Sequence, residues 1–216
     1  MNKIDTIVFD LGNVLIRWDP YPVLLKAFNN EDIKTRWFLD NICHMEWNTT
    51  LDTGIRFDDA KKQRIAEYPE YEEYIAIYLD KWEEMLQGAI DGTLDILKKL
   101  KESGKYKLFA ITNWSAEKFP VARQKYSFLS WFDDIVVSGE IGIVKPDRRI
   151  YKYAIDRFNL QQPESALFID DRMENIEAAG EFGIKGIHFR DPQQLAAELR
   201  SFGINLSSNH RNSYSS

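Results

Sequence analysis

The chain has 216 residues, 44% hydrophobic and 29% charged, which suits one globular domain with an insert or two small domains. Its formal net charge of −6 and the lack of a basic stripe argue against a nucleic-acid partner. The single cysteine, Cys43, excludes an internal disulfide, and no apolar run suits a signal peptide or a membrane span, so we expect a cytoplasmic protein with no membrane partner.

The first predicted element is a short buried strand from Thr6 to Asp10, with the sequence TIVFD. A β-branched and aromatic run that ends at a carboxylate and then at Gly12 and Asn13 is typical of a strand inside a parallel sheet. Residues 20–87 contain no comparable run and are rich in Trp, Tyr, Glu, Asp and Lys, with helical patterns such as Tyr71 to Leu86. We therefore predict a helical insert after the first strand.

Strands and helices alternate after this insert. The later strands are predicted at Lys107 to Thr112, Asp134 to Ser138, Ala166 to Asp170 and, more weakly, Gly186 to Phe189. Apolar residues at helical spacing predict helices at Thr93 to Glu102, Glu117 to Tyr126, Arg149 to Phe158, Asn175 to Phe182 and Gln193 to Phe202. The alternation predicts an α/β fold, in which helices cover both faces of a parallel sheet.

This pattern divides the chain into a core, an insert and a tail. Residues 1–19 and 88–206 are expected to form the α/β core, with residues 20–87 as the helical insert. The polar segment 207–216, SSNHRNSYSS, is predicted to be disordered. The sequence contains neither a P-loop motif nor Gly-x-Gly-x-x-Gly, which argues against a dinucleotide-binding fold.

Polar side chains follow the predicted strands, at the edge of the sheet where ligands of open α/β folds bind. The set comprises a carboxylate, a hydroxyl, an amide, an ammonium group and an acidic pair: Asp10, Thr112, Asn113, Lys145, Asp170 and Asp171. Each residue alone could serve a turn or a helix cap. Adjacent acids, however, repel each other unless a positive charge lies between them. Their joint occurrence at strand ends therefore favours a site.

This set suits phosphoryl transfer. A hard cation such as Mg²⁺ prefers carboxylate and carbonyl oxygens, which the acids can supply. Lys145 and Thr112 can hold the remaining phosphoryl oxygens. Asp10 could then attack the phosphorus and form an aspartyl-phosphate, a known kind of covalent intermediate.

The sequence resembles the haloacid dehalogenase superfamily of hydrolases over about residues 4–192. Four motifs occur in the family's order: VFDLGNVL with Asp10 in the nucleophile's place, FAITNWS with Thr112, VKPDRRIY with Lys145, and LFIDDRMEN with Asp170, Asp171 and Asn175. The resemblance implies a Rossmann-like three-layer core with a mainly parallel sheet, and an α-helical cap formed by residues 20–87.

The resemblance also implies the roles of the site residues and a Mg²⁺ cofactor. The metal would be held by Asp10, the backbone carbonyl of Gly12, and the pair Asp170 and Asp171. Thr112, Asn113 and Lys145 would bind the phosphate of a small phosphate ester, with Asp10, Thr112 and Lys145 as the catalytic residues.

Position 12 departs from the family pattern. Phosphatases of this superfamily usually have a second aspartate there as general acid and base, whereas this chain has Gly12. The DLGNVL form resembles a subgroup that includes glucose-1-phosphate phosphatases. A leaving group of low pKa, such as an anomeric sugar hydroxyl, needs less help from an acid. Asp19 is another candidate proton donor, although an aspartate before Pro20 is more typical of a turn.

Three functions stay open at this point. The first is a Mg²⁺-dependent phosphatase of a small phosphate ester, such as a sugar phosphate. The second is a 2-haloacid dehalogenase with Asp10 as nucleophile, which would need no acid at position 12 and would leave the acidic pair without a purpose. The third is a non-catalytic, phosphate-binding regulatory protein.

Two further groups are expected to be structural. Cys43 and His44 are predicted to pack within the insert. The four tryptophans Trp18, Trp37, Trp47 and Trp82 are predicted to be mainly core, with one or two lining the substrate pocket.

Overall fold

The computed structural model describes residues 3–206. Its centre is a five-stranded sheet in the order β5-β4-β1-β6-β7, in which every neighbouring pair is parallel. The strands are β1 (Thr6–Phe9), β4 (Lys107–Thr112), β5 (Asp134–Val137), β6 (Ala166–Asp170) and β7 (Lys185–His188). The five predicted strands are confirmed, and β1 is the middle strand.

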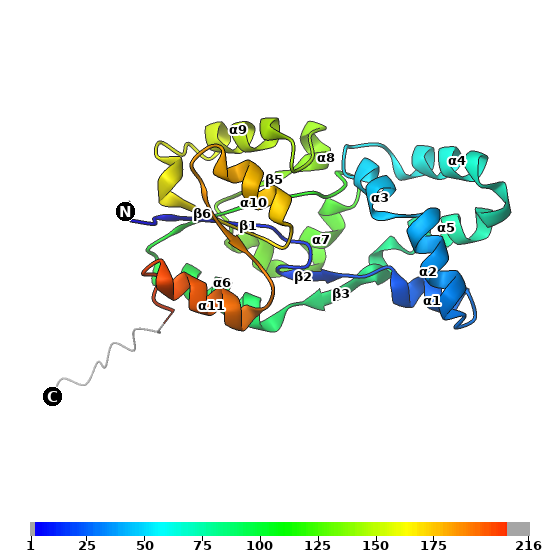
Figure 1. Ribbon diagram of the computed structural model, residues 1–216, viewed down its shortest axis with the longest axis horizontal. Coiled ribbons are helices and arrows are strands. Elements are labelled where there is room, and N and C mark those ends of the chain that lie inside the picture. Colours follow the sequence, from blue (N-terminus) through cyan, green and yellow to red (C-terminus); the bar gives the residue numbers. More distant parts are fainter. Residues whose placement is uncertain (1–2, 207–216) are drawn as a thin grey trace.

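Alternate side chains of the sheet pack into two separate cores, because successive residues of a strand point to opposite faces. On β1, Ile7 and Phe9 belong to one core and Val8 to the other. One face is covered by α6 (Asp91–Ser103), α7 (Phe119–Lys125) and α11 (Pro192–Ser201), and the other by α9 (Arg148–Arg157) and α10 (Met173–Gly180). The molecule is a three-layer, Rossmann-like α/β fold, as predicted (Figure 1).

A second lobe, made of helices, lies to one side of the sheet (Figure 1). Its helices are α1 (Tyr21–Ala27), α2 (Asp32–Asn41), α3 (Met45–Leu51), α4 (Phe57–Glu67) and α5 (Glu72–Asp80). Short 3₁₀ turns occupy Pro69–Tyr71, Trp82–Met85, Ser127–Trp131 and Pro163–Ser165, and the short helix α8 (Ser138–Ile141) follows β5. The helices of the lobe fall inside the predicted insert, whose boundaries stay a prediction.

The helical lobe has an aromatic core of its own. The rings of Phe28 and Tyr74 stack with centroids 3.8 Å apart, and Tyr78 is fully buried between the helices. The hydroxyl of Tyr78 donates a 2.9 Å hydrogen bond to Asn48 Oδ1, which fixes this side chain of α3. A buried partner of this kind holds a side chain more firmly than solvent would.

The expectations for Cys43 and His44 fit this packing. Cys43 is buried, which raises the pKa of its thiol well above the usual range, and this disfavours a thiolate. His44 caps α3, where its Nδ1 accepts a 3.2 Å hydrogen bond from the amide of Trp47.

One local prediction was wrong, and one pair of strands was missed. The predicted helix from Tyr71 to Leu86 is broken, because α5 ends at Asp80 and the chain continues through a 3₁₀ turn into β3 (Leu86–Ala89). This strand pairs antiparallel with β2 (Ile16–Trp18), so that both connections to the helical lobe run side by side. Neither strand was predicted, because their pairing depends on a partner about seventy residues away and not on a local pattern.

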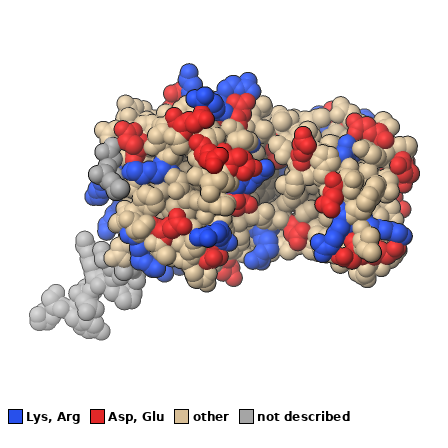
Figure 2. Space-filling view, viewed as in Figure 1, with Lys and Arg blue, Asp and Glu red and all other residues tan. Residues whose placement is uncertain are grey.

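Between residues 3 and 206, no helix has the length and apolar character that crossing a bilayer requires. The predicted disordered segment 207–216 lies outside the described residues. Acidic and basic side chains are interspersed over the face in Figure 2, and the surface is hollowed between the two lobes.

Candidate active site

Asp10 lies directly after β1, in the middle of the carboxyl edge of the sheet. Its amide donates a 2.8 Å hydrogen bond to Ile169 O of β6, which continues the parallel ladder up to the site. Its Oδ1 accepts a 2.7 Å hydrogen bond from the amide of Leu11 and lies 2.9 Å from Lys145 Nζ. The backbone therefore fixes the carboxylate with one oxygen engaged.

Lys145 joins the site from the loop after α8. Its side chain is 1% exposed, and its Nζ lies 2.7 Å from Asp170 Oδ2, 2.9 Å from Asp10 Oδ1 and 2.9 Å from Ile111 O. The three N–H donors of an ammonium group are therefore all used. Lys145 links the ends of three neighbouring strands, β4, β1 and β6.

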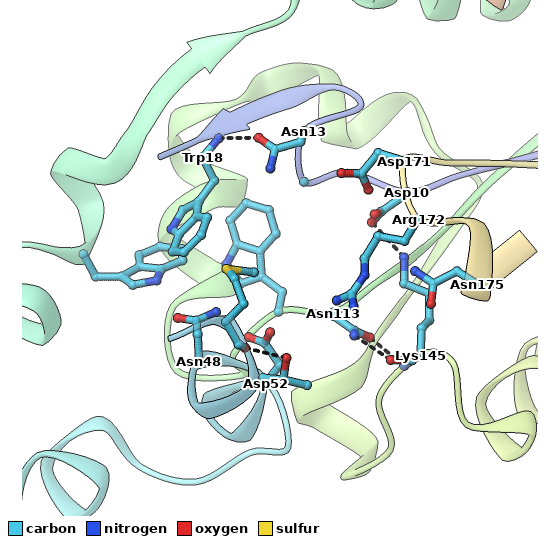
Figure 3. A pocket seen from close by; sticks show the side chains of 15 residues that line it. Asp10, Asn13, Trp18, Asn48, Asp52, Asn113, Lys145, Asp171, Arg172 and Asn175 are labelled. Carbon is cyan, nitrogen blue, oxygen red and sulfur yellow. Dashed lines mark hydrogen bonds and ion pairs between the residues drawn. The ribbon is translucent and has the colours of Figure 1, made fainter. Parts of the chain in front are cut away.

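The acidic pair ends β6, and its two members differ in environment. Asp170 is fully buried, and its Oδ1 accepts hydrogen bonds from the amide of Arg172 at 2.9 Å and from Asn175 Nδ2 at 2.8 Å. Asp171 is only half-buried and faces the pocket beside Asp10 (Figure 3). Oxygen atoms of Asp10, Asp170 and Asp171 all lie within 4.8 Å of one another.

Negative charge exceeds positive charge at this cluster. Burial raises the pKa of Asp10 to about 7; the ammonium of Lys145 acts against this rise, and the charges of Asp170 and Asp171 add to it. Burial also raises the pKa of Asp171, with Asp170 as the second cause. Burial alone would lower the pKa of Lys145, but Asp10 and Asp170 raise it above its usual value. A second cation would relieve the remaining repulsion.

Three carboxylates so placed suit a hard divalent cation, which takes oxygen ligands. The turn after β1 brings Gly12 to the same pocket, where its carbonyl could add a fourth oxygen. The donor set therefore fits the magnesium ion that the motifs imply. It offers no histidine or thiolate, which a zinc site would favour.

Thr112 is the last residue of β4 and Asn113 follows it, and their side chains differ in what they contact. Thr112 is fully buried, and its Oγ1 has no hydrogen-bond partner within the described part of the chain. Asn113 is occupied at both ends: its Oδ1 accepts from the amide of Lys145 at 2.8 Å, and its Nδ2 donates to Lys145 O at 3.0 Å. Asn113 thus supports the lysine loop, and its contact with phosphate stays a prediction.

A pocket opens over Asp10, between the sheet and the helical lobe, with a cavity volume of about 120 Å³. One wall carries the charged groups of the sheet edge, and the other carries side chains of the helical lobe (Figure 3). The apolar lining comes from Trp18, Met45, Trp82 and Trp114, and the polar lining of the helical lobe from Asn48, Thr49 and Asp52. The pocket therefore offers an ionic end and an aromatic end.

A model of the haloacid dehalogenase-like hydrolase family matches residues 4–183 of the chain. The chain belongs to this family. A sesquiterpene phosphatase of Aspergillus oryzae is 27% identical over 194 residues, which cover 89% of this chain and 93% of that protein. A drimenol cyclase of Aspergillus calidoustus is 24% identical over 200 residues. This match covers 91% of this chain but only 36% of the cyclase.

Solved structures of the haloacid dehalogenase family share the fold. A magnesium complex of a family enzyme from Bacteroides thetaiotaomicron superposes with a TM-score of 0.69 at 20% identity, over 92% of this chain and all of that chain. At 20% identity, this similarity supports the fold alone, and the chemistry has to be inferred from the residues of the site.

The structure brings Asp10, Lys145 and the acidic pair together at one place, and it adds pocket residues that the sequence analysis did not name. Trp18 and Trp82 line the pocket, in line with the expectation that one or two tryptophans would, whereas Trp37 is 46% exposed elsewhere. Asp52 and Arg172 were not predicted. Arg172 directly follows the acidic pair, which was an available signal, but nothing near Asp52 in the sequence indicates that it reaches the pocket.

Proposed function

We propose that this family member is a Mg²⁺-dependent phosphatase that hydrolyses a small phosphate monoester through an aspartyl-phosphate on Asp10. The proposal depends on one observation above all. Asp10, Lys145 and the acidic pair meet inside a pocket at the carboxyl edge of the sheet, with carboxylate oxygens within 4.8 Å of one another. The phosphatase activity of the Aspergillus oryzae relative and the magnesium complex of the Bacteroides enzyme support it.

Each residue has a part in this mechanism. One Asp10 oxygen attacks the phosphorus while Lys145 holds the other oxygen at 2.9 Å. The three N–H groups of Lys145 already bind protein oxygens, so its ammonium would act on the phosphoryl group through its positive charge. The hydroxyl of Thr112 would bind a phosphoryl oxygen, and the unpartnered state of this buried hydroxyl supports such a contact. Asp10, Asp171, the carbonyl of Gly12 and Asp170 would hold Mg²⁺, which supplies positive charge to the phosphoryl oxygens. Asn175 would position Asp170 through its 2.8 Å hydrogen bond.

The pocket also limits the leaving group. A volume of about 120 Å³ is below the roughly 300–1,000 Å³ of pockets for drug-sized ligands, which favours a small alcohol. Indole walls suit an apolar or ring-shaped group, and the side chains of Asn48 and Asp52 suit hydroxyl groups. A sugar phosphate meets both conditions. Longer prenyl phosphates would require the helical lobe to move away from the sheet.

The test measures release of inorganic phosphate from a panel of phosphate monoesters that includes sugar, triose and prenyl phosphates. We expect release with Mg²⁺ and none with a chelator. Asp10→Asn should abolish it, because an amide is a poor nucleophile. Asp58→Asn, an exposed position of α4 with the same change of charge, is the matched control and should retain full activity. No release from any member would refute the proposal, and chloride release from 2-chloropropionate under chelation would favour the dehalogenase.

A further inference from the structure

No acid of the sheet edge is free to protonate the leaving group. Gly12 lines the pocket, and a Cβ built there would meet no atom within 4 Å, so no other side chain of residues 3–206 has taken the place of the missing aspartate. The ionisable core residues of the pocket are Asp10, Lys145, Asp171 and Arg172. The first three are committed to the phosphoryl group and the cation, and an arginine does not release its proton. Asp19 is not among the residues that line the pocket, and its Oδ1 accepts a 2.9 Å hydrogen bond from the amide of Tyr21. The proton donor must therefore come from the helical lobe.

Asp52 is the only carboxyl group that the described part of the helical lobe contributes to this pocket. It follows the last turn of α3 and, with Asn48, lies across the hollow from Asp10 and Asp171 (Figure 3). Its carboxyl group forms no hydrogen bond or ion pair with any other residue between 3 and 206, although it is half-buried. A carboxyl group left unpaired in a pocket is available to a ligand.

The backbone that carries Asp52 is fixed to the sheet. Ser138 Oγ donates a 2.7 Å hydrogen bond to Asp52 O and accepts a 3.0 Å hydrogen bond from the amide of Trp114. Two residues on, Gly54 approaches Gly139 so closely that a Cβ on Gly54 would lie 2.6 Å from Gly139 O. The turn after α3 therefore packs on α8, which is itself hydrogen-bonded to the loop after β4, and these contacts hold Asp52 over the site.

We propose that Asp52 is the general acid of this enzyme, which protonates the leaving-group oxygen, and the general base that then activates water. This inference rests on the proposed phosphatase function. In the first step, an Asp10 oxygen bonds to phosphorus while the bond between phosphorus and the leaving-group oxygen breaks. This oxygen takes the proton of Asp52. In the second step, water attacks the phosphorus and gives its proton to Asp52. The bond to Asp10 breaks, and inorganic phosphate departs.

The electrostatics of the pocket agree with this role. Burial raises the pKa of Asp52 to about 8, the charge of Asp10 adds to the rise, and Lys145 acts against it. At neutral pH the group therefore carries the proton that an acid must donate. The charged and titratable groups that share its surroundings are Asp10, Lys145, Asp171 and Arg172 across the pocket and Tyr78 of α5 behind it.

The test compares two esters that differ in their need for a proton. An alkyl phosphate leaves as a basic alkoxide unless it is protonated, whereas p-nitrophenyl phosphate leaves as a stable phenolate. In Asp52→Asn, kcat/KM for the alkyl ester should fall by about 10²–10⁴-fold, and kcat/KM for the nitrophenyl ester should fall less than about 10-fold. The ratio kcat/KM reports transfer to Asp10 and is unaffected by the later hydrolysis of the aspartyl-phosphate.

Asp58→Asn should leave both values unchanged, and Asp52→Ser is a second variant in which the same split is expected. Equal losses for both esters would mean that Asp52 acts only in binding or folding, and no loss would mean that it has no part; either result overturns the inference. Wild-type protein that hydrolyses neither ester with Mg²⁺ would instead refute the proposed phosphatase function.

Discussion

Replacement of Lys145 by methionine tests whether the ammonium group holds the cluster of acids together. Methionine keeps most of the length of the side chain and removes its charge. The wild-type Nζ lies 2.7 Å from Asp170 and 2.9 Å from Asp10, at a side-chain exposure of 1%. Removal of one partner from a buried ion pair costs about 3–5 kcal/mol. We therefore expect the free energy of unfolding to fall by about that amount, which corresponds to roughly 6–20 °C in melting temperature for a chain of this size.

The effect should depend on pH with a defined sign. Burial raises the pKa of Asp10 from 3.8 to about 7, so the folded protein binds a proton more tightly than the unfolded chain between these values. Stability from this group is complete below pH 4 and is lost as the pH rises through 7. Without the opposing ammonium, the pKa of Asp10 rises further. The loss of unfolding free energy in Lys145→Met should therefore be smaller at pH 5 than at pH 8.

Urea unfolding in the presence of a chelator, at both pH values, measures these differences. The matched control is Lys34→Met, which breaks a 2.8 Å pair with Glu31 whose side chains are 62% and 51% exposed. Exposed pairs contribute about 0–1 kcal/mol, so the control should change stability little at either pH. Two results would refute the idea that Lys145 holds the acids together. One is a loss of unfolding free energy in Lys145→Met no larger than that of the control, and the other is a loss that is larger at pH 5 than at pH 8.

Two further outcomes follow from the same geometry. Asp10 must lose its proton to bind a cation, and its pKa is about 7. Mg²⁺ affinity measured by calorimetry should therefore fall by about 10-fold between pH 8 and pH 6. An affinity that does not change with pH would contradict the role of Asp10 as a metal ligand. Thr112→Val should preserve or raise the melting temperature, because it removes a buried hydroxyl without a partner among the described residues, while kcat/KM for phosphate release should fall at least about 10-fold. A less stable variant with full activity would show that the hydroxyl is structural.

The fold was largely predictable because its signals are local. β1 and β6 are short, mainly apolar runs that are buried throughout, as TIVF in β1 shows, and β4 and β5 are buried after their first residue. The edge strand β7, which the sequence predicted more weakly, is only partly buried. Gly104 ends α6 with a φ of 61°, in the left-handed conformation that glycine adopts without strain. The antiparallel pair of β2 and β3 was missed because Ile16–Trp18 and Leu86–Ala89 acquire strand structure only from each other.

The sequence by itself indicated which acids, and which lysine, belong at the carboxyl edge of the sheet. Parallel strands bring their carboxyl ends to one edge of a sheet, which is why Asp10, Thr112 and Asp170 were expected at the same edge. The structure adds that β4 and β6 flank β1, so these strand ends are neighbours. Tertiary structure alone decided what lies opposite them. Asp52 reaches the pocket through the packing of the helical lobe and through the contact of its carbonyl with Ser138, which is 86 residues away in the chain. Such a contact leaves no periodic trace in either segment, because one hydrogen bond requires only a hydroxyl and a carbonyl at the right place in space.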